Sequence, residues 1–193
     1  MSRTITKEEI SLLPIEEFHG NIYTINTIEE ANCAVDLLYQ SDKLGFDTET
    51  RPAFKKGNIH SVALLQLATE ETCFLFRLNK IGFPDSLIKL LSDSDITKIG
   101  ISLRDDFLSM GRKMKFKPDG FIDIQKIIPD YDIADSSLQK IYALLFGMKI
   151  SKNQRLSNWE NETLSEAQKK YAALDAWACL KIYQELQSNQ QNS

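Results

Sequence analysis

The sequence predicts an α/β protein, with a mixed β-sheet packed by helices. Between residues 44 and 78, apolar segments of strand composition follow one another over short connections, as neighbouring strands do. From residue 98 onward, strand-like segments alternate with helical ones. The 193 residues, 42% of them hydrophobic, suit one compact domain with a full core. We therefore expect a sheet of about five strands flanked by helices.

The first half of the chain begins with an N-terminal arm, residues 1–26, that holds one short strand at 22–25. Thr27 and Glu30 have capping-box spacing, so a helix is expected from there to about residue 39. Further strands are expected at 44–49, 61–68, 73–78 and 98–101, with a short helix at 85–91.

The second half contains two capping patterns. Ser136 with Gln139 predicts a helix that ends at Gly147, and Ser165 with Gln168 predicts a last helix to about residue 186. A helix from Ser102 and a strand at 121–124 precede them, and the polar residues 188–193 are expected to be a disordered tail after a domain at 27–187.

Composition excludes several function classes. There is no run of ~20 apolar residues, as a membrane helix needs, and the N-terminus lacks a signal-peptide core. Cys33, Cys73 and Cys179 are odd in number and far apart, so we expect buried thiols in a reducing, cytoplasmic setting. His19 and His60 are isolated, which disfavours zinc. A net charge of -4 argues against tight non-specific DNA binding.

Four carboxylates lie in three separate segments where bare acids are unusual. Asp47 and Glu49 end an apolar strand and, being two residues apart, face the same way. Asp106 stands in the first turn of an expected helix, and Asp175 lies among apolar helical neighbours. Gathered together, four anions would repel one another unless divalent cations lay between them. This pattern indicates a metal-dependent site that cleaves phosphate esters.

Each acid also has a structural alternative. The strand-end pair Asp47 and Glu49 is, taken alone, better explained by exposure to solvent. Asp105 suits a helix cap with Ser102, which leaves Asp106 either free for chemistry or simply solvated. Only Asp175 favours a functional role by itself, because a carboxylate among apolar groups needs a partner or a metal. Tyr171, one turn before it, belongs to the core or holds a water.

Two basic clusters are candidates for contact with a nucleic-acid strand. Phosphate contacts combined with a stacking aromatic suit single strands, although most surface lysines are only solvated. The candidate residues are Arg51, Phe54, Lys55 and Lys56 in one cluster and Lys152, Arg155 and Trp159 in the other.

Together these segments resemble the DEDD superfamily of 3'-5' exonucleases, in its tyrosine branch. The motifs are Phe46-Asp47-Thr48-Glu49, the stretch 98–106 with its acid six residues after Gly100, and Tyr171-Ala172-Ala173-Leu174-Asp175. The likeness covers about residues 27–187. It is nearest to the exonuclease domain of the Werner syndrome helicase and more distant to ribonuclease D and the DNA polymerase I proofreading domain.

The resemblance implies a ribonuclease H-like fold with one interior antiparallel strand. It also implies two Mg²⁺ or Mn²⁺ ions, with Asp47 bridging both, Glu49 and Asp175 completing the coordination of the first ion, and Asp106 holding the second ion. By the same resemblance, the ions would activate the attacking water and stabilise the leaving 3' oxygen. Tyr171 would orient the water, and the products would be nucleoside 5'-monophosphates.

The substrate remains open at this point. We expect a DNA 3'-5' exonuclease acting on single-stranded or recessed 3' ends. The alternatives are an exoribonuclease like ribonuclease D, which would share every site residue, and a non-catalytic nucleic-acid-binding module.

Overall fold

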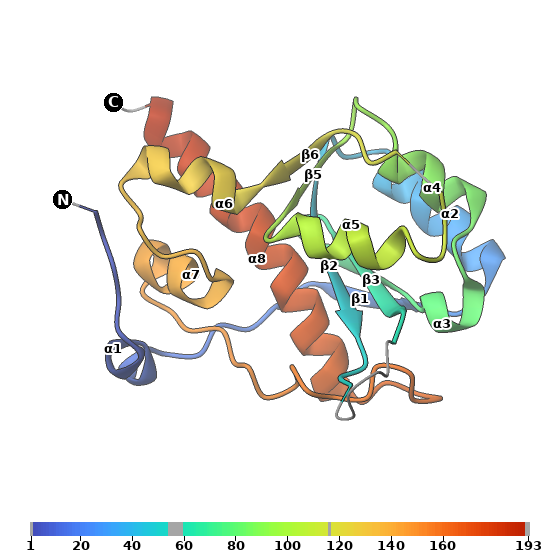
Figure 1. Cartoon of the computed structure of the whole chain (residues 1–193), viewed down its shortest axis with the longest axis horizontal. Coiled ribbons are helices and arrows are strands. Elements are labelled where there is room, and N and C mark those ends of the chain that lie inside the picture. The colour runs from blue at the N-terminus through green and yellow to red at the C-terminus, as the bar shows by residue number, and fades with distance from the viewer. Residues whose placement is uncertain (1, 54–59, 116, 192–193) are drawn as a thin grey trace.

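A six-stranded mixed sheet forms the centre of the protein (Figure 1). The computed structural model describes residues 2–53, 60–115 and 117–191. The strand order is β1-β4-β3-β2-β5-β6, and β3 is antiparallel to both of its neighbours while the other pairs are parallel. The strands are β1 (Asn21–Ile25), β2 (Lys43–Thr50), β3 (Val62–Ala68), β4 (Thr72–Phe76), β5 (Thr97–Gly100) and β6 (Phe121–Asp123). The mixed sheet with an interior antiparallel strand is confirmed.

The strand beyond the five expected in the sheet is β1, which lies at one edge. The sequence predicts a short strand here as part of an N-terminal arm, and in the structure all five of its residues pair in parallel with β4. The arm also contains the helix α1 (Lys7–Leu12), which begins with a capping box between Thr6 and Glu9. It is tied down further by a hydrogen bond of 2.5 Å from the Tyr142 hydroxyl to the buried Glu16 carboxylate. The arm is therefore part of the folded domain.

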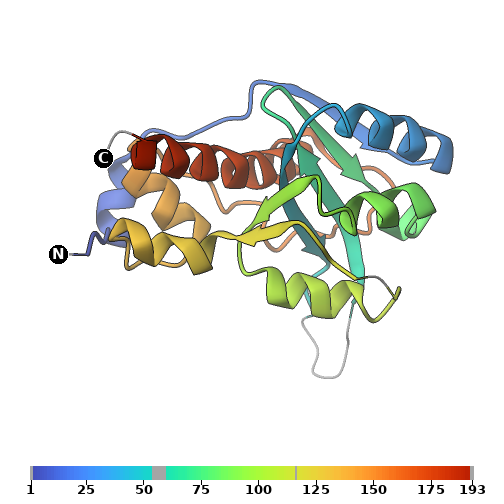
Figure 2. The ribbon, with the colours of Figure 1, turned by 90° about the horizontal axis from the view of Figure 1, so that it is seen from above.

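Helices cover both faces of the sheet, as the view from above shows (Figure 2). One apolar layer joins Leu64 and Leu75 of the sheet to α8, and the other joins Phe46 and Leu65 to α2 and α4. Because both faces are covered, all seven residues of β3 are buried. The helices are α6 (Ile124–Ile127), α7 (Leu138–Phe146) and α8 (Glu166–Gln191) on the first face, and α2 (Ile28–Leu38), α4 (Asp85–Leu91) and α5 (Leu103–Met110) on the second; α3 (Leu78–Ile81) and the 3₁₀ turn Ile128–Tyr131 lie between elements.

Gly45 allows α8 to pack closely across β2. A Cβ atom at Gly45 would lie 2.0 Å from the Ala176 carbonyl oxygen and 3.2 Å from the Leu180 Cβ atom. A side chain here would have to push the helix away from the strand. The contact matters for the site because Asp47 follows Gly45 on the same face of the strand, and Asp175 adjoins Ala176.

Of the three predicted pairings of a Ser or Thr cap with a Glu or Gln three residues later, two are confirmed and one is wrong. Thr27 with Glu30, and Ser165 with Gln168, make reciprocal hydrogen bonds at the starts of α2 and α8. Ser136 does not cap α7. Ser137 holds the cap position, and the Gln139 amide instead donates to the Ile150 carbonyl oxygen at 2.7 Å.

The expected tail and one expected core residue also differ. Helix α8 continues through residue 191, so most of the segment assigned to a disordered tail is helical, and 192–193 lie outside the described residues. Cys33 is exposed on α2, whereas Cys73 and Cys179 are buried as expected. Within the described residues, no helix is long and apolar enough to cross a membrane.

Candidate active site

Three acids from the strand β2 and the helix α8 form one cluster. Asp47 and Glu49 point from the same face of β2, and Asp175 reaches them from α8, which packs on that face. One carboxylate oxygen of each lies within 4.8 Å of the others. Asp175 is buried, with 7% of its surface exposed, and its Oδ1 atom has no hydrogen-bond partner among the described residues. This arrangement offers oxygen ligands to a divalent cation.

Crowding and burial make these acids hard to ionise. Burial, then Glu49, Asp175 and Asp106, raises the pKa of Asp47 well above its usual range. Burial, followed by the charges of Asp175 and Asp106, raises the pKa of Glu49 to about 9. Burial raises the pKa of Asp175 to about 7. The folded chain thus holds together carboxyl groups whose ionised forms only a compensating positive charge would make favourable.

Asp106 lies beside this cluster on helix α5. Its carboxylate accepts a hydrogen bond from the Thr48 hydroxyl, which faces the opposite side of β2 from Asp47. Burial raises the pKa of Asp106 to about 6, against the lowering effect of that hydrogen bond. Its charge also raises the pKa of Asp47 and Glu49, so the four acids form one electrostatic group.

A fifth acid, Asp123, sets the start of α5. Ser102 occupies the cap position but makes no side-chain cap bond, contrary to the prediction. Its backbone is left-handed, with φ of 59°. The Asp123 carboxylate accepts instead from the N–H groups of Ser102 and Leu103, at 3.2 and 3.1 Å. Sequence spacing missed this residue because it caps a helix from a strand about twenty residues later.

Tyr171 adjoins the acid cluster from one turn before Asp175. Burial, and then the charge of Asp175, raise the pKa of its hydroxyl far above the ordinary value, so this group stays protonated. Its hydrogen bond with Asp175 counteracts the rise in the pKa of that carboxyl. The hydroxyl is therefore a fixed proton donor at the edge of the site.

A hollow of about 330 Å³ opens beside the acids and carries two of the predicted basic contacts. It is lined by Asp47, Tyr171 and Asp175 and by the exposed side chains of Lys152 and Arg155. The positive charge of Lys152 lowers the pKa of Asp175, and that of Arg155 lowers the pKa of Glu49. These two cations therefore lie within electrostatic reach of the acid cluster.

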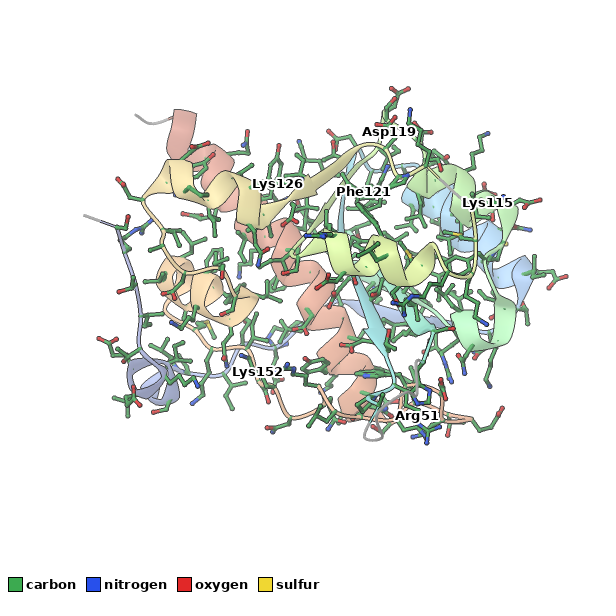
Figure 3. The ribbon with its side chains drawn as sticks, viewed as in Figure 1. Arg51, Lys115, Asp119, Phe121, Lys126 and Lys152 are labelled. Carbon is green, nitrogen blue, oxygen red and sulfur yellow. The ribbon has the colours of Figure 1, made fainter. Side chains whose placement is uncertain are left out.

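A second hollow, of about 450 Å³, lies on the Asp106 side and includes Arg51, His60 and Arg112. Arg51 and His60 both contact Glu160 at 3.2 Å, which ties the segment after β2 to the segment before α8. Figure 3 shows Arg51 and Lys152 at the end of the molecule toward which β2 points. The other residues predicted in this cluster, Phe54, Lys55 and Lys56, lie outside the described residues.

Trp159 contradicts the prediction of a stacking platform. Its side chain is completely buried in the apolar layer beneath α8, and its ring lies 6.0 Å from that of Tyr171. The turn that follows it is held by the buried Arg77, which donates to the Asn161 carbonyl oxygen. Sequence position alone could not distinguish a core tryptophan from a surface one, because the turn that buries it depends on Arg77, more than eighty residues away.

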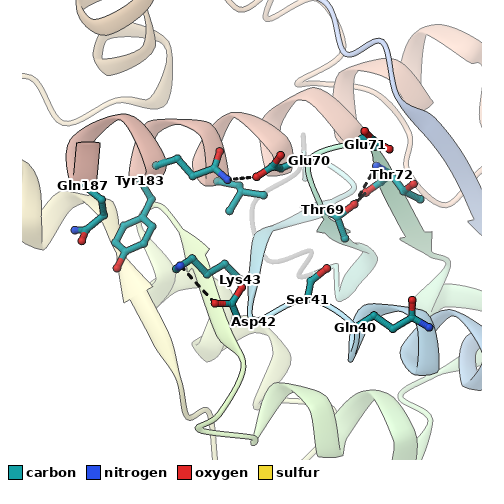
Figure 4. A pocket seen from close by; sticks show the side chains of 12 residues that line it. Gln40, Ser41, Asp42, Lys43, Thr69, Glu70, Glu71, Thr72, Tyr183 and Gln187 are labelled. Carbon is teal, nitrogen blue, oxygen red and sulfur yellow. Dashed lines mark hydrogen bonds and ion pairs between the residues drawn. The ribbon is translucent and has the colours of Figure 1, made fainter. Parts of the chain in front are cut away.

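The opposite end of β2 has a hollow of about 520 Å³, lined by polar side chains that include Asp42, Lys43, Glu70 and Tyr183 (Figure 4). Its lysine and two of its carboxylates already have polar partners. Lys43 contacts Asp42 at 3.5 Å, and Gln184 donates to Glu70 at 2.6 Å. It contains none of the four clustered acids, so it does not compete with them as a candidate active site.

A protein-family model for 3'-5' exonucleases matches residues 22–191. The chain belongs to this family. It is 34% identical over 186 residues to the mouse bifunctional 3'-5' exonuclease/ATP-dependent helicase WRN. This match covers 90% of this chain and 13% of WRN. It is 33% identical to an Arabidopsis thaliana 3'-5' exonuclease over 74% of this chain and 52% of that protein. The chain thus spans about half or less of the length of these relatives.

Solved structures show the same fold at lower identity. The exonuclease domain of Aedes aegypti Nibbler superposes with a TM-score of 0.78 at 21% identity, covering 99% of this chain and 94% of that domain. Escherichia coli RNase D gives the same TM-score and identity, covering 89% of this chain and 46% of RNase D. These structures share the ribonuclease H-like fold of this chain. The family match and the identity with WRN place the chain in the DEDD superfamily of 3'-5' exonucleases.

The residues present fit a divalent metal site. The donor set is all carboxylate oxygen, which suits Mg²⁺ and Mn²⁺ and disfavours zinc. The buried Asp175 Oδ1 atom lacks a partner among the described residues, as an unused ligand atom would. A bound cation would also supply the positive charge that this crowded group of acids lacks.

Proposed function

We propose that this exonuclease hydrolyses the terminal phosphodiester at the 3' end of DNA and releases nucleoside 5'-monophosphates with two Mg²⁺ or Mn²⁺ ions. The observation that carries the proposal is the convergence of Asp47, Glu49 and Asp175 within 4.8 Å, with Asp106 beside them. In this assignment Asp47 would contact both ions, Glu49 and Asp175 would hold the first, and Asp106 would hold the second. Bound ions would supply activation of the attacking water and stabilisation of the leaving 3' oxygen.

The protein's own groups position the reactants. Tyr171 keeps its proton and donates it in a hydrogen bond to Asp175, so its hydroxyl oxygen orients the attacking water by accepting a hydrogen bond and does not act as a base. Lys152 and Arg155 line the adjoining hollow and are placed to contact phosphate oxygens of the strand. Arg51 lines the hollow on the Asp106 side, where it contacts a further nucleotide.

DNA is proposed over RNA because of the sequence relatives. The chain is 34% identical over 186 residues to the mouse exonuclease/helicase WRN. An exoribonuclease is the second candidate, since structures named as RNase D, one of them in complex with RNA, share the fold. We propose single-stranded and recessed 3' ends as substrates, because both present a free terminus to a site at the end of β2.

Product analysis tests the proposal. DNA and RNA oligonucleotides of one sequence, labelled at the 5' end, are incubated with protein and Mn²⁺, as single strands and as recessed duplexes. We expect a ladder shortening from the 3' end and 5'-monophosphate products, faster on DNA. Asp47→Asn is the inactive control, and Asp105→Asn, an exposed acid beside the site, is the matched active control. Undiminished activity of the Asp47 variant would remove the metal-dependent mechanism, and faster RNA digestion would favour the second candidate.

A further inference from the structure

Gln66 is a polar side chain within the sheet that the proposed reaction leaves without a role. It lies in the middle of β3, where every other residue is apolar, and its side chain is completely buried. Neither its Nε2 nor its Oε1 atom has a hydrogen-bond partner among the described residues. Leaving a buried polar group unpaired costs about 1–3 kcal/mol. A leucine at this position would avoid that cost, so the glutamine is expected to have a compensating function.

Gln66 lies directly beside the acid proposed to contact both ions. In the register of the antiparallel strands β2 and β3, Gln66 is the partner of Asp47. Opposed residues point to the same face with their Cβ atoms about 5 Å apart, and a glutamine side chain spans that distance. The amide is therefore within reach of the Asp47 carboxylate from the side of the sheet, away from Glu49 and Asp175.

Few groups on that side of Asp47 can orient it. The thiols of Cys73 and Cys179 are buried near Asp47, and burial followed by the Asp47 charge raises the pKa of both thiols. Thiols are weak donors. The hydrogen bond that lowers the pKa of Asp47 comes from the Thr48 backbone. A carboxamide N–H is a stronger donor than a thiol, and because it is uncharged it does not reduce the attraction of the cluster for a cation.

We propose that Gln66 is a positioning residue whose carboxamide donates a hydrogen bond to the Asp47 carboxylate when Asp47 holds a divalent cation. The inference rests on the proposed metal-dependent function. A cation fixes Asp47 in its anionic form, and an anionic carboxylate is the stronger acceptor. Groups that orient metal-binding side chains in this way typically change metal affinity by about 10–100-fold.

A different role would be purely structural. The Trp159 Nε1 atom is also buried without a partner among the described residues and belongs to the same side of the sheet. A buried water shared by Gln66 and Trp159 would satisfy both side chains. In that arrangement, Gln66 would stabilise the fold and leave metal affinity unchanged. Removing the amide would then lower the stability of the metal-free protein, whereas in the positioning role it would lower the affinity for metal.

Gln66→Leu separates these roles, with calorimetric titration of metal-free protein by Mn²⁺ and denaturant unfolding in EDTA as the two measurements. We expect Mn²⁺ to bind about 10–100-fold more weakly, while the metal-free variant is at least as stable as wild type. Leu65→Met, whose side chain faces the other side of β3, is the matched control and should bind Mn²⁺ as wild type does. Gln66→Met, a linear side chain of similar length, repeats the test if leucine disturbs the packing.

The outcomes are distinct. Wild-type Mn²⁺ affinity in either folded variant would overturn the proposal, and a loss of stability in EDTA with that result would favour the structural water. A wild-type protein that itself fails to bind Mn²⁺ would overturn the proposed function together with this inference. Weaker binding in the Gln66 variants, alongside normal binding in Leu65→Met, would support it.

Discussion

Replacing Asp175 with asparagine should stabilise the metal-free protein. Burial places the Asp175 pKa at about 7, against an ordinary value of 3.8, so the folded chain retains a proton that the unfolded chain has released. This contribution to stability is complete below about pH 4 and is lost progressively up to about pH 7, because the folded pKa is the higher one. At about 1.4 kcal/mol for each pKa unit, the loss at pH 8 is about 4 kcal/mol.

Asparagine keeps the size of the side chain and carries no charge. In EDTA at pH 8, we expect the free energy of unfolding of Asp175→Asn to be up to about 4 kcal/mol higher than that of wild type. For a domain of this size, this corresponds to a rise in Tm of roughly 8–16 °C. The difference should shrink toward pH 4. Asp105→Asn, an exposed acid, should change stability by less than about 0.5 kcal/mol at either pH.

Added Mn²⁺ should narrow this difference in stability at pH 8. Wild type gains about 2.7 kcal/mol when free metal is at 100 times its Kd, whereas the variant lacks a ligand and gains less. The assay is denaturant unfolding followed by circular dichroism, at pH 4.5, 6 and 8, with EDTA or with Mn²⁺. If Asp175→Asn were less stable than wild type in EDTA at pH 8, the claim that the acids are held together against their repulsion would be refuted.

Three further variants test separate parts of the structure. Tyr171→Phe should lower kcat by about 100-fold, in the range for a group that positions a proton, with an unchanged circular dichroism spectrum; a wild-type rate would exclude Tyr171 from the mechanism. Trp159→Ala should lower the free energy of unfolding by about 3–5 kcal/mol because the ring is in the core, whereas a rise in KM at unchanged stability would mean that it stacks on substrate. Gly45→Ala should lower both stability and metal affinity, because its Cβ atom would displace Ala176 and with it Asp175. Denaturant unfolding would measure the stability and titration calorimetry the metal affinity. If both quantities were unchanged, the close packing of α8 on β2 would be contradicted.

The local features of this fold could be predicted from sequence because the residues involved are neighbours in the chain. The capping boxes of α2 and α8 each span three residues, and both form as expected. The Thr6 and Glu9 pair has the same spacing, so α1 could have been predicted from that pattern. The two-residue spacing of Asp47 and Glu49 puts both side chains on one face of a strand. The four-residue spacing of Tyr171 and Asp175 puts them on one face of a helix.

Features that depend on distant contacts could not be predicted in this way. Asp123 caps α5 from the neighbouring strand β6, and Trp159 is buried by a turn that Arg77 holds from just after β4. The closeness of Asp175 to Asp47 depends on Gly45, where the absence of a side chain lets α8 approach β2. The apolar setting of Asp175 and the family resemblance predict both acids from sequence, but the physical means of bringing them together is visible only in the fold.

Diffraction from crystals soaked in Mn²⁺ would show whether the four acids bind metal ions. Data collected near the manganese absorption edge locate each ion independently of the protein atoms. We expect two anomalous peaks at the end of β2, one contacted by Asp47, Glu49 and Asp175 and the other by Asp47 and Asp106. Peaks elsewhere, or none at these four carboxylates at saturating Mn²⁺, would contradict this expectation.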